Sequence, residues 1–287
     1  MTNFQERIIF GGSASLIAVL LIILSFHWTA RLLLVAGITA LATVAVWEYY
    51  KATEQKGYQP IARIGTCAST VYCLSVFLAS QNAALAQLPM SILWCTGFLL
   101  FGYHFIRGNR PVESLSITTF GIVYITIPIS FLIAINFIDD PIEATSGRYW
   151  LLYLVLVTKS TDTAAYFIGR SLGRRPLAPI LSPKKTVEGA VGGTVSAIAM
   201  SFIIACAAEY TSLIPSIGLS LTGSVLLGAA VAITAQVGDL SESLIKRDTG
   251  VKDSNQLPGL GGILDVADSL IFTGPMLYLL LSYKIVG

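Results

Sequence analysis

The stretch QVGDLSESLIKRDTGVKDSNQLPGLGGILDVADS, residues 236–269, joins two apolar segments and sets the fold expected for the whole chain. It begins and ends in apolar sequence of helical character, yet it holds five Asp, one Glu and three Lys or Arg. In a membrane protein, such a cluster is expected only where water, a metal ion or an anionic ligand shares the site. We therefore expect two membrane-spanning helices whose ends meet at a polar site.

Helical spacing places the polar residues of this stretch on two faces. Asp239, Ser243 and Lys246 recur at i, i+4 and i+7, and Asp265 and Asp268 at i, i+3. Two carboxylate faces joined by a loop can hold a hard cation together with a phosphate, and Mg²⁺ favours one or two carboxylates plus substrate phosphates. The alternative is a solvated loop whose acids act as ordinary helix caps.

The composition predicts an all-α, polytopic membrane protein. Hydrophobic residues make up 54% of the chain and charged residues 12%, against about 25% charged in soluble domains, and the mean hydropathy is +0.74. The four Cys lie apart in apolar segments without a C-x-x-C pair, which gives no indication of a metal knuckle or a disulfide framework. No nucleic-acid partner is expected.

A membrane span needs about 20 mostly apolar residues, and nine such segments are predicted. They are 8–26, 30–49, 62–80, 88–106, 115–138, 149–169, 187–208, 217–238 and 263–284. The first is interpreted as a retained span because its apolar run is too long for a signal peptide. We expect residues 1–287 to form a single membrane domain, with hydrophobic spans in 1–140 and the spans that carry the polar stretches in 149–287. The polar loops of this second part are expected at 170–188 and 239–262.

The distribution of basic residues predicts the orientation. With nine spans, 14 of the 18 Lys and Arg lie on the side of the N-terminus, 3 lie on the other side, and Lys159 lies inside a span. Cytoplasmic loops carry the excess of Lys and Arg. We therefore expect a multi-pass protein of a bacterial inner membrane, with its N-terminus and both polar loops in the cytoplasm.

A second polar stretch covers residues 159–193. Lys159 and Asp162 lie at i, i+3 within an apolar segment, where either a structural ion pair or a polar site is expected. In SPKKTVEG, Ser182 suits an N-cap and Pro183 the first helical position. A helix starting there would offer an anion site reinforced by two lysines in its first turn. The alternative for these cations is an anchor to anionic lipid headgroups. Gly189 and Gly193 form a G-x-x-x-G pair that lets another helix approach closely.

Both polar stretches resemble the phosphatidate cytidylyltransferases, also called CDP-diacylglycerol synthases. The first is similar to the family signature S-x-x-K-R-x-x-x-x-K-D, then P-G-H-G-G, then D-R-x-D. The second is similar to D-x-x-A-Y-F-x-G-R-x-x-G followed by S-P-K-K-T-x-E-G. Leu260 and Val266 stand where the family usually has His and Arg, so roles of those two side chains do not carry over.

The resemblance implies the reaction CTP + phosphatidate → CDP-diacylglycerol + pyrophosphate, with Mg²⁺ as cofactor and membrane lipids around the protein. A second cation such as K⁺ and assembly as a homodimer are compatible with it. It implies metal ligation by Asp239 and Asp265, with Asp268, Lys252 and Asp253 completing the catalytic set. The implied substrate-binding residues are Asp162, Arg170, Ser182, Lys184, Lys185, Thr186, Ser243, Lys246 and Arg247.

Two other functions are open at this point. A CTP-dependent lipid kinase would transfer the γ-phosphoryl group and release CDP instead of pyrophosphate. A non-enzymatic transporter would use the intramembrane Lys159 and Asp162, although the polar residues gather at one membrane face and no inverted repeat is visible.

Overall fold

The computed structural model describes residues 15–140, 145–210, 217–250 and 262–285, and these are almost entirely helical. Two short antiparallel pairs, β1–β2 and β3–β4, are the strands found in these ranges. The helices, including the 3-10 turns η1 and η2 and the π-helical turn η3, are η1 (Leu24–Phe26), α2 (Trp28–Gln55), α3 (Ala62–Gln81), η2 (Ala83–Leu85), α4 (Leu88–Arg107), α5 (Pro111–Gly121), η3 (Ile122–Thr126), α6 (Ile127–Asn136), α7 (Gly147–Leu172), α8 (Val187–Tyr210), α9 (Leu221–Thr249) and α10 (Ile263–Ser282). The strands are β1 (Asp139–Asp140), β2 (Thr145–Ser146), β3 (Pro176–Ala178) and β4 (Ser182–Thr186).

The predicted polytopic helical membrane protein is confirmed. Within the described ranges, eight helical segments are long and apolar enough to cross a membrane, and Ser15–Phe26 adds a shorter apolar helix. The segment α5–η3–α6 acts as one span, Pro111–Asn136. The first predicted span, 8–26, begins among residues outside the described ranges.

Several helices extend further than the apolar pattern predicts. The helix α2 ends at Gln55 instead of residue 49, and α9 ends at Thr249 instead of residue 238. A helix continues through the membrane interface wherever its polar side chains can reach water or partners, so hydropathy alone places its end too early. The predicted loop 239–262 is therefore wrong in its first part, because residues 239–249 belong to α9.

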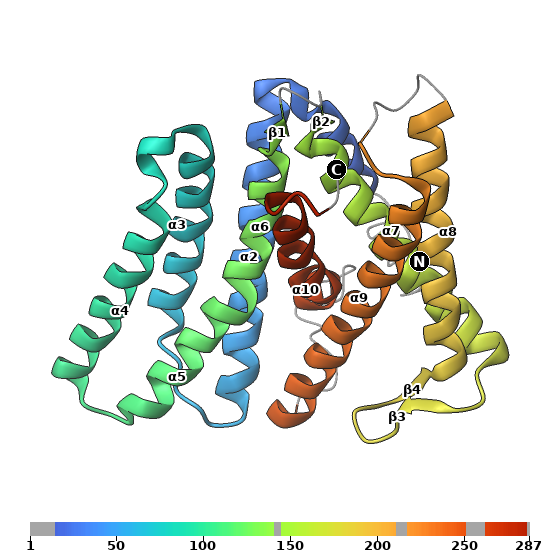
Figure 1. Cartoon of the computed structure of the whole chain (residues 1–287). Helices are drawn as coiled ribbons and strands as arrows, with labels where there is room; N and C mark the ends of the chain where they lie inside the picture. The colour runs from blue at the N-terminus through green and yellow to red at the C-terminus, as the bar shows by residue number, and fades with distance from the viewer. Residues whose placement is uncertain (1–14, 141–144, 211–216, 251–261, 286–287) are drawn as a thin grey trace, which may run out of the picture. The chain divides into compact units, whose positions relative to one another are not determined.

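Packing divides the chain into two compact units. Unit 1 comprises Met1–Ala134 and Ile245–Ala267, and unit 2 comprises Ile135–Leu244 and Asp268–Gly287. In unit 1, α3 contacts α2 on one side and α4 on the other (Figure 1). The fully buried Tyr50 of α2 donates a hydrogen bond of 2.7 Å to the carbonyl of Thr118 in α5. Gly65 and Gly121 lie against the Tyr50 ring, where any larger side chain would collide with it.

Unit 2 is built on the close pair α7 and α8, which the β3–β4 hairpin connects (Figure 1). A Cβ atom at Gly189 would lie 2.7 Å from the carbonyl oxygen of Ala165, and one at Gly193 would lie 2.9 Å from that of Thr161. This confirms the close approach predicted from the G-x-x-x-G pair. Gly238 of α9 likewise lies against the backbone of α10, at the carbonyl of Asp268.

The orientation can be tested within unit 1. Cysteines introduced at Ala86, between α3 and α4, and at Asn109, between α4 and α5, should lie on opposite sides of the membrane. In a variant lacking the four native cysteines, a membrane-impermeant maleimide added to intact cells should label Ala86→Cys and leave Asn109→Cys unlabelled until the cells are lysed. Labelling of both positions in intact cells would contradict the predicted orientation.

Candidate functional site

The start of α8 differs from the prediction. A helix beginning at Ser182 is wrong, because residues 182–186 form β4 and α8 begins at Val187. The Thr186 hydroxyl accepts a hydrogen bond of 3.1 Å from the Gly189 N–H, which is the contact of an N-cap side chain. Lys184 and Lys185 therefore lie on a strand and not in the first turn of a helix.

The hairpin is fastened to the start of α8 by Glu188. One of its carboxylate oxygens accepts hydrogen bonds from the backbone N–H groups of Arg174 and Arg175, at 3.0 and 3.1 Å. The Val187 N–H also donates to the Arg175 carbonyl at 2.9 Å. These contacts fix β4, and with it Lys185, relative to α8.

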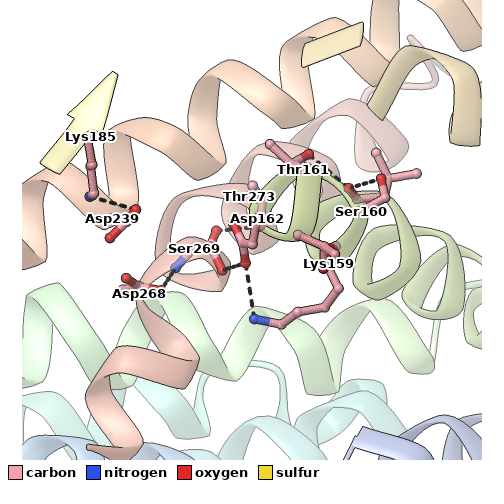
Figure 2. A network of polar contacts seen from close by, with 11 residues as sticks. Lys159, Ser160, Thr161, Asp162, Lys185, Asp239, Asp268, Ser269 and Thr273 are labelled. Carbon is pink, nitrogen blue, oxygen red and sulfur yellow. Dashed lines mark hydrogen bonds and ion pairs between the residues drawn. The ribbon is translucent and has the colours of Figure 1, made fainter. Parts of the chain in front are cut away.

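Lys185 reaches α9. Its Nζ lies 2.6 Å from Oδ2 of Asp239 (Figure 2). The same Nζ lies 3.5 Å from the Ser243 hydroxyl. Asp239 and Ser243 lie one turn apart on the same helical face, as their spacing predicts. The structure therefore brings together three residues from the two polar stretches of the sequence.

Three carboxylates gather beside this contact. Asp239 and Glu242 of α9 and Asp268 of α10 each offer an oxygen, and these oxygens lie within 4.8 Å of one another. Glu242 and Asp268 are only 3% and 6% exposed. Buried like charges at this separation repel strongly unless a cation or a proton is shared among them. An all-oxygen set of carboxylates is the donor set that Mg²⁺ prefers, so these residues fit the predicted cofactor.

Glu242 was missed in the sequence. It lies three residues after Asp239, so helical spacing alone would have placed the two carboxylates on one face. The structure confirms that Glu242 lies on α9, which continues to Thr249.

Asp162 of α7 adjoins the same group. Its Oδ2 lies 3.2 Å from Nζ of Lys159, which confirms the predicted ion pair. The same oxygen accepts a hydrogen bond of 3.3 Å from the hydroxyl of Ser269, the residue after Asp268 (Figure 2). The sequence left open whether Asp162 forms an ion pair with Lys159 or belongs to a polar site. In the structure it does both.

Asp265 has a different partner from the one expected. It forms an ion pair with Lys246 inside unit 1. In the part of the chain that the structure describes, the acids grouped with Asp239 are Glu242 and Asp268. A metal role for Asp265 stays a prediction.

The other predicted residues lie at the surface or outside the described ranges. Arg170 donates a hydrogen bond of 3.1 Å to the hydroxyl of Tyr166, one turn earlier on α7. Lys184 and Arg247 are exposed, and Ser182 is half-buried on β4. Val266, on α10, is 37% exposed. Lys252, Asp253 and Leu260 lie outside the described residues.

Comparison with known proteins gives the family. The model of the cytidylyltransferase family matches residues 5–284. The phosphatidate cytidylyltransferase of Bacillus subtilis is 32% identical over 284 residues, which cover 98% of this chain and 99% of the relative. That of Brucella suis is 31% identical over 280 residues, or 97% and 93% of the two chains, and that of Chlamydia muridarum is 27% identical over 294 residues, or 98% and 93%. The chain belongs to the cytidylyltransferase family.

Proposed function

We propose that this enzyme transfers the cytidylyl group of CTP to phosphatidate, giving CDP-diacylglycerol and pyrophosphate. The observation that carries the proposal is the placement of Lys185, on the SPKKT strand, beside the acids of α9 and α10. This arrangement combines a cation for phosphate groups with carboxylates for a divalent metal ion. The family and the names of the curated relatives support the same reaction.

The chemistry needs little beyond positioning and charge neutralisation. A phosphate oxygen of phosphatidate forms a bond to the α-phosphorus of CTP, the bond from that phosphorus to the bridging oxygen breaks, and pyrophosphate leaves. The second pKa of a phosphate monoester is about 6, so the attacking group is already anionic near neutral pH. No side chain has to remove a proton from it, and the group of acids is better suited to hold a metal ion than to act as a general acid and base.

We propose that Asp239, Glu242 and Asp268 hold Mg²⁺. The metal role that the family resemblance implies for Asp265 stays a prediction. The bound ion would supply positive charge for the phosphates of CTP and the departing pyrophosphate. Lys185 would bind a phosphate oxygen as a point charge. Its 2.6 Å contact with Asp239 shows that its side chain reaches the acids.

The membrane setting suits a lipid substrate. Asp239 and Lys246 occupy the last three turns of the span α9, so a headgroup can reach them while its acyl chains stay in the bilayer. We propose that this end faces the cytoplasm of a bacterial cell, where CTP is available. The alternatives find less support, because the relatives carry neither a kinase nor a transporter name.

The reaction itself is directly testable. Purified protein supplied with phosphatidate, Mg²⁺ and CTP labelled at the α-phosphorus should place the label in a lipid and release unlabelled pyrophosphate. A control with diacylglycerol in place of phosphatidate should give no labelled lipid. Label recovered as CDP, with pyrophosphate absent, would contradict the proposal and indicate a lipid kinase.

Lys185 should contribute to binding of the phosphates. Losing one charge-assisted hydrogen bond costs about 1.5–3 kcal/mol, so Lys185→Ala should lower kcat/KM by roughly tenfold to a hundredfold. The matched control is Arg174→Ala, which removes a cation from the segment just before β3 and keeps the backbone contact with Glu188. Normal kinetics in Lys185→Ala would restrict this residue to a lipid-anchoring role.

The acids should determine the response to metal. Glu242→Gln and Asp268→Asn keep the size of the side chain and remove a charge, so each should raise the Mg²⁺ concentration for half-maximal activity by about tenfold. Binding of Mn²⁺ to the solubilised protein, followed by electron paramagnetic resonance, should weaken in parallel. Unchanged Mn²⁺ binding in both variants, or full wild-type turnover in excess EDTA, would contradict this metal site.

A further inference from the structure

We infer that Glu48, a buried carboxylate of α2, positions the first turn of α10 and thereby sets Asp265 for the reaction. This assignment rests on the proposed function. It gives the hydrophobic N-terminal part of the chain a residue that acts on the catalytic helices.

The contacts of Glu48 are those of a helix cap. Its Oε1 accepts a hydrogen bond of 3.1 Å from the Ile263 N–H, and its Oε2 accepts one of 2.9 Å from the Leu264 N–H. Ile263 and Leu264 open α10, and the first N–H groups of a helix have no acceptor inside the helix. A carboxylate at this end also interacts favourably with the helix dipole.

The cap comes from a remote part of the sequence. A helix is ordinarily capped by the side chain of the residue just before it, but the residue before Ile263 is Gly262, which has no side chain. Glu48 lies more than two hundred positions earlier and is only 4% exposed. Burying a carboxylate to this degree in a membrane-spanning helix has a high free-energy cost. Both oxygens of Glu48 accept hydrogen bonds from α10, which offsets part of that cost.

The capped turn carries a predicted catalytic residue. Asp265 directly follows Leu264 in the first turn of α10 and contacts Lys246 at the end of α9. Glu48 therefore holds the backbone of this turn through Ile263 and Leu264, and Lys246 holds the Asp265 carboxylate. These contacts give Glu48 a positioning role and not a contact with substrate.

A second contact connects the end of α2 with the end of α9. Lys56, which follows α2, lies 2.7 Å from the Asp248 carboxylate near the end of α9. This hydrogen-bonded partner raises the pKa of Lys56. The pair is exposed, and exposed pairs contribute little. Of the two links from α2, the buried one at Glu48 is the one expected to matter for activity.

Kinetic measurements distinguish a positioning role of Glu48 from a purely structural one. Full-length Glu48→Ala protein in detergent should show a kcat at least about tenfold lower than wild type, per folded molecule, with the KM for CTP within about twofold. Glu48→Gln keeps one carbonyl acceptor for one of the two N–H groups, so it should recover part of the lost kcat. Lys51→Ala is the matched control, because Lys51 lies on the same helix and pairs locally with Glu54.

Hydrogen–deuterium exchange provides a readout that does not depend on turnover. The amides of Ile263 and Leu264 should exchange faster in Glu48→Ala, and to a smaller extent in Glu48→Gln, than in wild type or Lys51→Ala. A wild-type kcat in folded Glu48→Ala, accompanied only by a lower melting temperature, would overturn the inference. If Glu48→Ala does not fold, a wild-type kcat and wild-type amide protection in Glu48→Gln would overturn it. Failure of the proposed function would show separately, as an absence of pyrophosphate release by the wild-type protein.

Discussion

The mutual repulsion of three clustered carboxylates, two of them buried, is the constraint on which the rest of unit 2 depends. Asp239, Glu242 and Asp268 bring three acids within 4.8 Å at the ends of apolar helices. A charge there is costly unless it is paired or bound to metal. Two lysines reduce this repulsion. Lys185 forms an ion pair with Asp239, and Lys159 forms one with the adjoining Asp162. Positive charge in this region therefore stabilises the folded unit, and it also suits the proposed reaction.

Close packing of small residues makes this acid group possible. Gly238 precedes Asp239 and lies against the carbonyl of Asp268, so the backbones of α9 and α10 come close together beside the acids. Gly189 and Gly193 do the same for α8 and α7, which brings the hairpin and Asp162 into one compact unit. Without the hydrophobic effect to hold helices together in lipid, van der Waals contact between such surfaces is the main source of cohesion. The same glycines therefore serve both stability and the geometry of the site.

The sequence predicted the parts of this structure that follow from local pattern. Hydropathy located the spans, and helical spacing correctly placed Asp239 with Ser243 and Lys159 with Asp162. The contacts between elements were not predictable in this way. The pairing of Lys246 with Asp265, the cap from Glu48 and the hydrogen bond from Ser269 to Asp162 join residues 19, 215 and 107 positions apart. Spacing within one helix carries no information about such contacts. A single acid near the end of an apolar span, such as Glu48, carries no local sign that it caps a distant helix.

The incorrect helix start at Ser182 has a physical reason that bears on how the site works. Two lysines in the first turn of a helix would oppose its dipole, and Thr186 offers an equally good cap four residues later. In a strand the same two lysines meet no dipole, and successive side chains point to opposite faces. Lys184 is exposed, whereas Lys185 is half-buried and its side chain reaches Asp239. Adjacent cations can therefore take different tasks, one at the acids and one toward the solvent or the lipid surface. If a helix began at Ser182, Lys184 and Lys185 would lie side by side at its N-terminal end.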